Sequence, residues 1–208
     1  LQADLLSSDL PFFPKVLKGI SEVAAKEEYD VIMTLADRND FSRLSRVIEN
    51  HKVDGLILMR TLQDDKTEEM LKKSDLPFVA VGLSDDPNIC QVDHDHADAC
   101  RELTSILLLK GLRRIAVVSG DTNYIINRKR LEGFYKAHKE LGYTPDESLI
   151  FTNVDSGLFA ARVTDLILMR DVNCIIGADD FLTSLVLKKL EEESIAIPED
   201  LRLASFHD

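Results

Sequence analysis

The sequence is poor in features that mark several classes of protein: it has no tryptophan, three cysteines and no long apolar run. Cys90, Cys100 and Cys174 are odd in number and show no C-x-x-C spacing, which indicates reduced thiols rather than a disulfide framework or a structural zinc site. The longest apolar run, residues 106–109, is far shorter than the ~20 residues that span a bilayer. No basic segment followed by an apolar one opens the sequence, so we expect a cytoplasmic protein with no membrane partner.

Basic side chains are the scarcer charge: 25 lysines and arginines stand against 37 aspartates and glutamates, a formal net charge of −12. Binding to nucleic acid needs clustered Lys and Arg to neutralise phosphates. The acidic balance therefore disfavours direct reading of DNA by these residues. The length of 208 residues allows one domain or two small ones with a conventional apolar core.

Short apolar runs rich in β-branched residues recur along the chain, separated by longer amphipathic stretches. Each run is almost continuously apolar, which is typical of parallel strands covered on both faces. The predicted strands are residues 3–6, 30–35, 55–59, 78–81, 89–92, 114–118, 174–176 and 203–206.

The stretches between the strands place apolar residues at the i, i+3, i+4 and i+7 spacing of an amphipathic helix. The predicted helices are residues 16–24, 44–48, 103–108, 131–141 and 182–190. This alternation indicates an α/β protein with parallel sheets and right-handed crossovers. Because a turn-rich segment at 83–88 precedes a second series of strand–helix units, we expect two doubly wound subdomains, residues 1–93 and 94–208.

Ligands of open α/β sheets bind outside the carboxyl ends of the strands, so the residues that follow each predicted strand are candidates for binding. Phe12 and Phe13 offer aromatic faces that stack on sugars or bases, although one of them can equally pack into the core. Arg130 interrupts an apolar helix pattern and could bind a ligand or pair with Glu132 or Glu191. The remaining candidates are polar or flexible groups after strands, each of which could instead be a helix cap or loop residue: Arg38, Met59, Thr61, Asn153, Asp179 and His207.

Catalytic motifs are missing from the sequence, which has no G-x-G-x-x-G, no G-x-x-x-x-G-K-[ST] and no G-x-S-x-G segment. His94 and His96 are too closely spaced for the i, i+4 pair that binds zinc from a helix, and Asp93 or Asp95 reads as a helix N-cap. The pairs at 85–86 and 179–180 read as turn and cap residues rather than acid–base or Mg²⁺ groups. We therefore expect no enzyme activity, no cofactor and no metal.

Several segments, in this order, resemble the effector-binding core of LacI-family transcription regulators, which has a fold like that of type I periplasmic binding proteins. The N-terminal ones begin with Pro11-Phe12-Phe13, followed by Gly19-Ile20 and Ala24-Ala25. The others are VDGLIL at 53–58, LPFVAVG at 76–82, GLRRIA at 111–116, RLEGF at 130–134, IPED at 197–200 and ASFHD at 204–208. The resemblance covers essentially the whole chain.

The resemblance implies a small effector, usually a sugar or a related metabolite, held between the two subdomains, and a homodimer that binds operator DNA through a helix-turn-helix head. It places Phe12 and Phe13 in the aromatic pair that packs on the ligand, and Arg130 and Asp179 among its polar contacts. His207 stands where relatives commonly have an aspartate, and Thr152 or Asn153 stands at an aromatic position. We expect these 208 residues to lack both the head and the C-terminal end of the core.

The function predicted from these observations is an allosteric regulator core that performs no chemistry. The alternative within the same fold is the sugar-binding protein of an ABC transporter, which an export leader upstream of Leu1 would indicate. A doubly wound enzyme is a third class, for which the sequence offers neither nucleophile nor cofactor motif.

Overall fold

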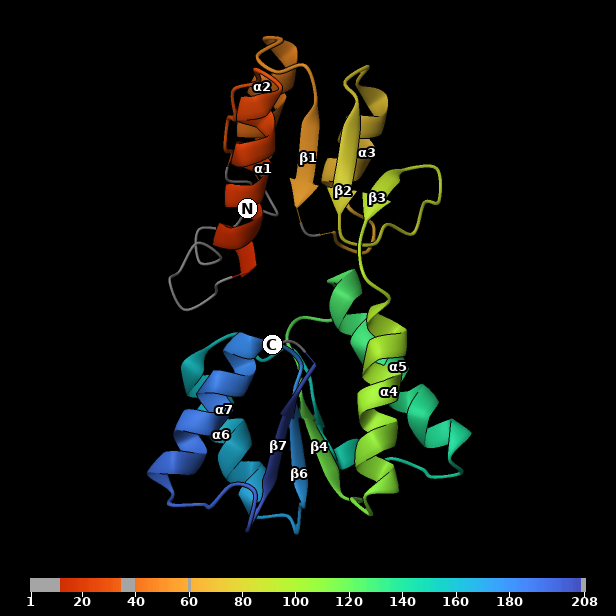
Figure 1. The fold of residues 1–208 in the computed structure, drawn as a ribbon, viewed down its shortest axis with the longest axis vertical. Helices are drawn as coiled ribbons and strands as arrows, with labels where there is room; N and C mark the ends of the chain where they lie inside the picture. Colours follow the sequence, from red (N-terminus) through yellow and green to blue (C-terminus); the bar gives the residue numbers. More distant parts are fainter. Residues whose placement is uncertain (1–11, 35–39, 60, 207–208) are drawn as a thin grey trace. The chain divides into compact units, whose positions relative to one another are not determined.

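The computed structural model describes residues 12–34, 40–59 and 61–206. The chain divides into two compact units, Leu1–Asp93 and His94–Asp208. Figure 1 shows a sheet with flanking helices in each of them.

The first unit contains a parallel sheet of three strands in the order β1-β2-β3. The strands are β1 (Leu56–Met59), β2 (Phe78–Val81) and β3 (Cys90–Val92), and the helices are α1 (Phe12–Lys26), α2 (Ser42–Glu49) and α3 (Lys66–Lys73). Helix α3 begins at an N-cap, Asp65, whose carboxylate accepts hydrogen bonds from the backbone N–H groups of Thr67 and Glu68. Such a cap satisfies donors that have no partner inside the helix.

The second unit contains a parallel sheet of four strands in the order β5-β4-β6-β7. The strands are β4 (Ile115–Val118), β5 (Ile150–Phe151), β6 (Cys174–Gly177) and β7 (Arg202–Ser205). The α-helices are α4 (His96–Leu109), α5 (Ile125–Glu140), α6 (Gly157–Leu168) and α7 (Asp180–Glu192), and a short 3-10 helix covers Glu147–Leu149. Figure 1 shows α4 and α5 on one side of this sheet and α6 and α7 on the other.

Every residue of β4 and β6 is buried, because both faces of the sheet are covered. Ala116 and Val118 point into a cluster with residues of α6 and α7, whereas Ile115 and Val117 point into a second cluster with residues of α4 and α5. The alternation follows from the two-residue period of a strand. Continuous apolar character is therefore what this central position requires.

Helices α4 and α5 approach each other at Gly133. A Cβ atom at that position would lie 2.2 Å from the carbonyl oxygen of Ala97 and 2.8 Å from the backbone nitrogen of Arg101, both in α4. Only a residue without a side chain permits this contact between two backbones. The approach fixes α5, which carries Arg130, against α4.

The predicted fold class, α/β with two parallel sheets, is confirmed. Strands were predicted at or within two residues of β1, β2, β3, β4, β6 and β7, and parts of five helices were predicted correctly. The two-residue strand β5 and the helices α3 and α6 were not predicted. The predicted strand at 3–6 lies outside the described residues.

The predicted strand at 30–35 is wrong for residues 30–34, which form neither strand nor helix; Leu35 lies outside the described residues. Its central side chains stay exposed: 45% for Val31, 54% for Ile32 and 50% for Met33. A buried strand of a parallel sheet is covered on both faces, whereas the described residues leave these three side chains about half exposed.

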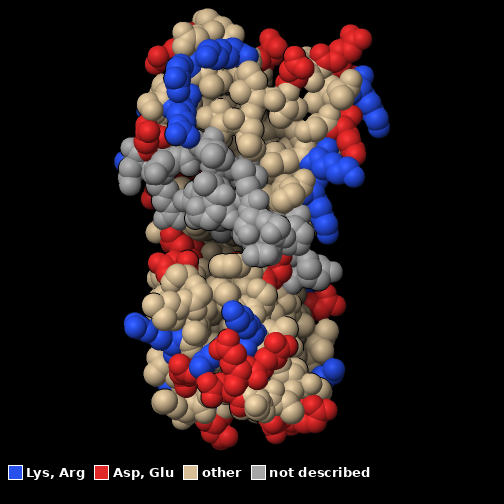
Figure 2. All heavy atoms as spheres, turned by 90° about the vertical axis from the view of Figure 1, so that its left-hand side faces the viewer, with Lys and Arg blue, Asp and Glu red and all other residues tan. Residues whose placement is uncertain are grey.

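Charged side chains of both signs lie close together on the face of the second unit that Figure 2 shows. Lys189 on α7 lies 2.9 Å from a carboxylate oxygen of Asp165 and 2.6 Å from one of Glu193. Throughout the described ranges, each helix is too short or too polar to cross a membrane.

Candidate functional site

The loops that follow β4, β5 and β6 meet at the carboxyl edge of the second sheet, because all of its strands are parallel. Backbone hydrogen bonds join them: Asn153 N–H donates to Gly120 O at 3.0 Å, Val154 N–H to Ser119 O at 3.1 Å and Ala178 N–H to Val118 O at 2.8 Å. The edge is therefore one hydrogen-bonded framework on which polar side chains are held.

Asn153 is an exposed member of this framework. Its φ of 59° lies in the left-handed region, which asparagine adopts more readily than most residues. Its side-chain oxygen accepts a hydrogen bond from the backbone N–H of Thr122 at 3.2 Å. The amide thus lies beside the β4–α5 loop, on a residue that is exposed.

Arg130 projects from α5 into the unit and is only 3% exposed. Burial raises the pKa of the neighbouring Cys100 thiol to about 12, and the positive charge of Arg130 partly opposes that shift. The carboxylate of Glu132, one expected partner of Arg130, lies 2.8 Å from the ammonium nitrogen of Lys129. The guanidinium is thus held inside the second unit.

Asp179 is the N-cap of α7, where its Oδ1 accepts a hydrogen bond from Leu182 N–H at 2.8 Å. The alternative considered for this residue, a helix cap, is confirmed. Thr183 strengthens the same turn, because its hydroxyl donates to Asp179 O at 2.6 Å. Capping occupies one carboxylate oxygen, so a ligand contact by Asp179 stays a prediction.

The candidates in the first unit differ in exposure. Phe12 and Phe13 open α1 with ring centroids 5.2 Å apart in an edge-to-face arrangement, and Phe12 is 37% exposed. Met59 is the half-buried last residue of β1. Thr61 is buried, and its hydroxyl donates a hydrogen bond to Leu83 O. That bond gives Thr61 a structural role. Arg38 and His207 lie outside the described residues.

Two polar residues near the carboxyl edge of the second sheet are buried: Ser119, which follows the predicted strand at 114–118, and Asn127 on α5, which was not predicted. Ser119 is 0% exposed and Asn127 is 1% exposed. The sequence did contain a signal for Asn127, because residues 127, 130, 134 and 137 form the buried stripe of α5 and a polar residue in that stripe is unusual.

Asp86 and Asp95, two of the carboxylates near the histidines and in the acidic pairs, are engaged within the protein. Asp95 is the N-cap of α4, as expected, and accepts a hydrogen bond from Asp98 N–H at 2.9 Å. Asp86 bonds Lys72, which lowers the pKa of its carboxyl to about 2. Among the residues that the structure describes, no three His, Cys, Asp or Glu side chains are placed to hold a metal ion.

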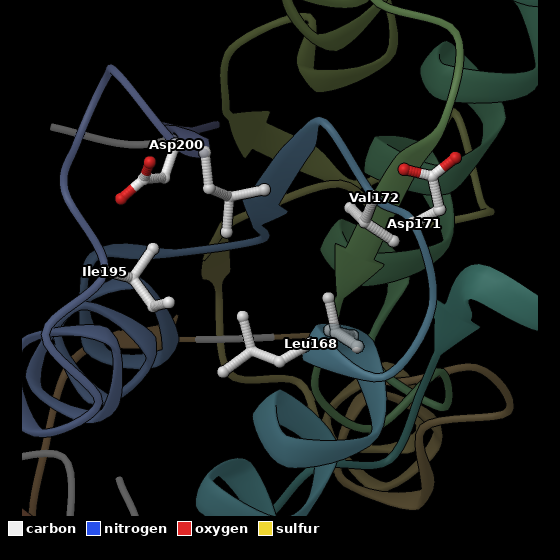
Figure 3. A pocket seen from close by; sticks show the side chains of 7 residues that line it. Leu168, Asp171, Val172, Ile195 and Asp200 are labelled. Carbon is white, nitrogen blue, oxygen red and sulfur yellow. The ribbon is translucent and has the colours of Figure 1, made fainter.

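A cavity of about 140 Å³ opens at the opposite, amino edge of the second sheet. Its walls are mostly apolar, and Figure 3 shows the carboxylates of Asp171 and Asp200 at opposite sides of it. Asp200 is engaged within the protein, because its Oδ2 accepts a hydrogen bond from Ala196 N–H at 3.0 Å. The cavity lacks converging polar groups, so the carboxyl edge remains the candidate site.

Residues 4–164 match a family model described as periplasmic binding proteins and sugar binding domain of LacI family. The chain belongs to this family. The match confirms the resemblance seen in the sequence.

Individual relatives within the LacI-type family agree. The HTH-type transcriptional regulator MalR of Streptococcus pneumoniae is 33% identical over 143 residues, which cover 68% of this chain and 44% of that protein. A transcription regulator like protein from Staphylococcus haemolyticus has a crystal structure with a TM-score of 0.85 and 28% identity, covering 96% of this chain and 74% of that one. A structure of a transcriptional regulator CelR–cellobiose complex has a TM-score of 0.81 at 24% identity, covering 93% of this chain and 61% of that one, and shows the fold.

Proposed function

We propose that the chain is the effector-binding and dimerisation core of a bacterial LacI-type transcription regulator that acts in the cytoplasm. A small metabolite, in the first place a sugar, binds at the carboxyl edges of the sheets and controls DNA binding by a helix-turn-helix head outside these 208 residues. The observation that carries the proposal is the match of residues 4–164 to the family of periplasmic binding proteins and the sugar binding domain of LacI family, together with the similarity to the transcriptional regulator MalR. The chain spans 44% of the MalR relative, whose name includes the DNA-binding motif.

The chemistry of the candidate residues supports a sugar. The Asn153 amide and the Arg130 guanidinium offer hydrogen bonds to hydroxyl groups, and the Phe12–Phe13 pair offers an apolar surface for a sugar ring. The CelR structure is a complex with cellobiose, which makes a disaccharide the first ligand to test.

The first experiment is a thermal-shift panel of cellobiose, maltose, a sugar phosphate and a purine base, followed by calorimetric titration of each hit. A ligand at 100 times its Kd stabilises the folded state by about 2.7 kcal/mol. Stabilisation by one of the carbohydrates supports the proposal. A shift with the purine alone would overturn the sugar assignment, and no shift with any probe would overturn effector binding by this site.

Variants at the carboxyl edge locate the site. Asn153→Gly keeps the left-handed backbone and removes the amide, so we expect effector affinity to fall by about threefold to tenfold with little change in stability. Ser194→Gly is the matched control, since Ser194 also has a positive φ but follows α7. Arg130→Ala should weaken effector binding and leave the dimer intact; equal affinities for all three variants and the wild type would move the site elsewhere.

The homodimer belongs to the same proposal. Apolar side chains are exposed along one face of α6, with Leu158 69%, Leu166 44% and Met169 80% accessible, and a second copy of the chain is the partner that would cover them. Sedimentation velocity of Leu158→Arg should show dissociation. Leu109→Arg is the control on the other side of the sheet, at a leucine that is 73% exposed. A wild-type monomer at micromolar concentration would overturn the dimer.

A further inference from the structure

The buried side chain of Asn127 joins the β4–α5 loop to α5. Its Nδ2 donates a hydrogen bond of 2.9 Å to the carbonyl oxygen of Asp121. The same carbonyl accepts Tyr124 N–H at 3.2 Å, and the carboxylate of Asp121 accepts Asn123 N–H at 2.8 Å. Asn127 is therefore bonded to Asp121, the residue that also accepts hydrogen bonds from two backbone N–H groups of the loop.

Glycine at position 120 allows this amide to approach the loop. A Cβ atom on Gly120 would lie 3.1 Å from Nδ2 of Asn127, closer than ordinary side-chain packing permits. On the other side of the loop, Asn153 accepts a hydrogen bond from Thr122 N–H and donates its own N–H to Gly120 O. The loop is thus held from two elements, by a buried amide on α5 and an exposed one after β5.

Stability alone does not explain why an amide occupies position 127. The side-chain oxygen of Asn127 is buried with no hydrogen-bond partner among the described residues, and the same is true of the Ser119 hydroxyl at the end of β4. Buried polar atoms without partners are rare in folded proteins and reduce stability. An apolar residue in this stripe of α5 would pack without that penalty, as Phe134 and Ala137 do.

We infer that Asn127 is a positioning residue of the ligand site. It does not touch the ligand; it holds the β4–α5 loop in the conformation in which Asp121, Thr122 and Asn123 lie beside Asn153. A preformed loop binds more tightly because less chain must be ordered when the ligand arrives. The part of this inference that concerns the ligand rests on the proposed function.

Asn173 provides a matched control for Asn127. It lies at the amino edge of the same sheet, where Arg202 N–H donates to its carbonyl oxygen, and its side-chain oxygen is likewise buried without a partner among the described residues. Asn127→Ala and Asn173→Ala each remove one amide of this kind from the same unit, at opposite edges of the sheet.

Hydrogen exchange of the ligand-free protein tests the hold on the loop. Asn127→Ala should raise the exchange rates of the Thr122, Asn123 and Tyr124 amides by about fivefold or more, the change that loss of one hydrogen bond allows, while Asn173→Ala leaves these rates unchanged. Asn127→Asp, which has the same shape but no amide donor, should behave like Asn127→Ala. Equal rates in Asn127→Ala and wild type would overturn the inference.

Titration with the carbohydrate found in the panel tests the consequence for binding. Asn127→Ala should weaken binding by about threefold or more relative to Asn173→Ala, at a temperature where both variants are fully folded. Unchanged affinity despite a mobile loop would overturn the role in the site. Failure of the wild-type protein to bind any probe would overturn the proposed function, and the exchange comparison alone would then decide whether Asn127 holds the loop.

Discussion

Gly133 is the residue at which the smallest chemical change should have the largest effect. In Gly133→Ala, the added methyl group meets backbone atoms of α4 at 2.2 and 2.8 Å, which cannot move aside as a side chain could. We expect a loss of about 2 kcal/mol or more in the free energy of unfolding, measured by urea denaturation. Gly19→Ala is the control. Gly19 is an exposed residue of α1, and a Cβ atom there would meet no described atom within 4 Å outside the backbone of its own helix. This substitution should raise the free energy of unfolding by up to ~1 kcal/mol.

His138 should make stability depend on pH. It is 2% exposed, and its Nδ1 lies 2.9 Å from Phe134 O. Burial lowers the pKa of its imidazole, so the folded protein resists a proton that the unfolded chain takes up near pH 6.5. The contribution of neutral His138 to the free energy of unfolding is therefore fully present above about pH 6.5. It is lost as the pH falls below that value towards the folded-state pKa of the imidazole.

The comparison that checks this prediction is urea denaturation of wild type and His138→Gln between about pH 7.5 and 5.5. The wild type should lose more stability across the interval than the variant. If the free energy of unfolding falls equally with pH in both proteins, groups other than His138 cause the pH dependence.

Residues that follow strands could be named from the sequence, because a strand's end is visible as the end of an apolar run. Asp179, which follows the predicted strand at 174–176, was found in this way. Asn153 was also named, although the strand before it, β5, was not predicted, and the structure places it on the framework at the carboxyl edge. Asn127 was not found: its place in the buried stripe of α5 was a signal in the sequence, but the partner of its amide, Asp121 O, is known only from the structure. Thr61 had the right position, but its hydroxyl bonds Leu83 O.

Helix α7 offers a way to separate capping from ligand contact at Asp179. Asp179→Ala removes the acceptor for Leu182 N–H and should cost about 1 kcal/mol of stability, whereas Asp179→Asn keeps an oxygen there and should cost only a few tenths. Urea denaturation measures both, and equal losses would contradict the cap. If Asp179→Asn weakens effector binding at wild-type stability, its carboxylate contacts the ligand directly.

Whole elements were predictable where burial on both faces imposes a continuous apolar run, as in β4 and β6. Helix α3 was missed because only Met70 and Leu71 of its eight residues are apolar, and its Asp65 cap was the better signal. Helix α6 was missed although Ser156 caps it, since its many apolar residues obscure a helical stripe. The strand β5 contains two residues, too few to show any period.

The charge of the whole chain makes a prediction about DNA. With a formal net charge of −12, these 208 residues should repel phosphates, so the isolated chain should not retard duplex DNA in a mobility-shift experiment at about 50 mM salt. Adding the effector should not change that result. Retardation that weakens with added salt would instead place DNA contacts within this chain.

At the scale of the molecule, the sequence predicted two parallel sheets because the strand–helix alternation restarts after a turn-rich segment at 83–88. The second unit, His94–Asp208, shows how its sheet is covered by helices on both sides. What the sequence could not supply is the convergence of separate loops at one edge, since that depends on the strand order β5-β4-β6-β7, which differs from chain order.

The approach of α4 and α5 at Gly133 also has a mechanical consequence. Backbone atoms of the two helices come close together there, and packed protein interiors are hardly compressible. A displacement of α5 at Asn127 and Arg130 would therefore displace α4 as well. Helix α4 begins at His96, two residues after the division between Asp93 and His94. A displacement of α4 would therefore move the segment of chain that joins the two units.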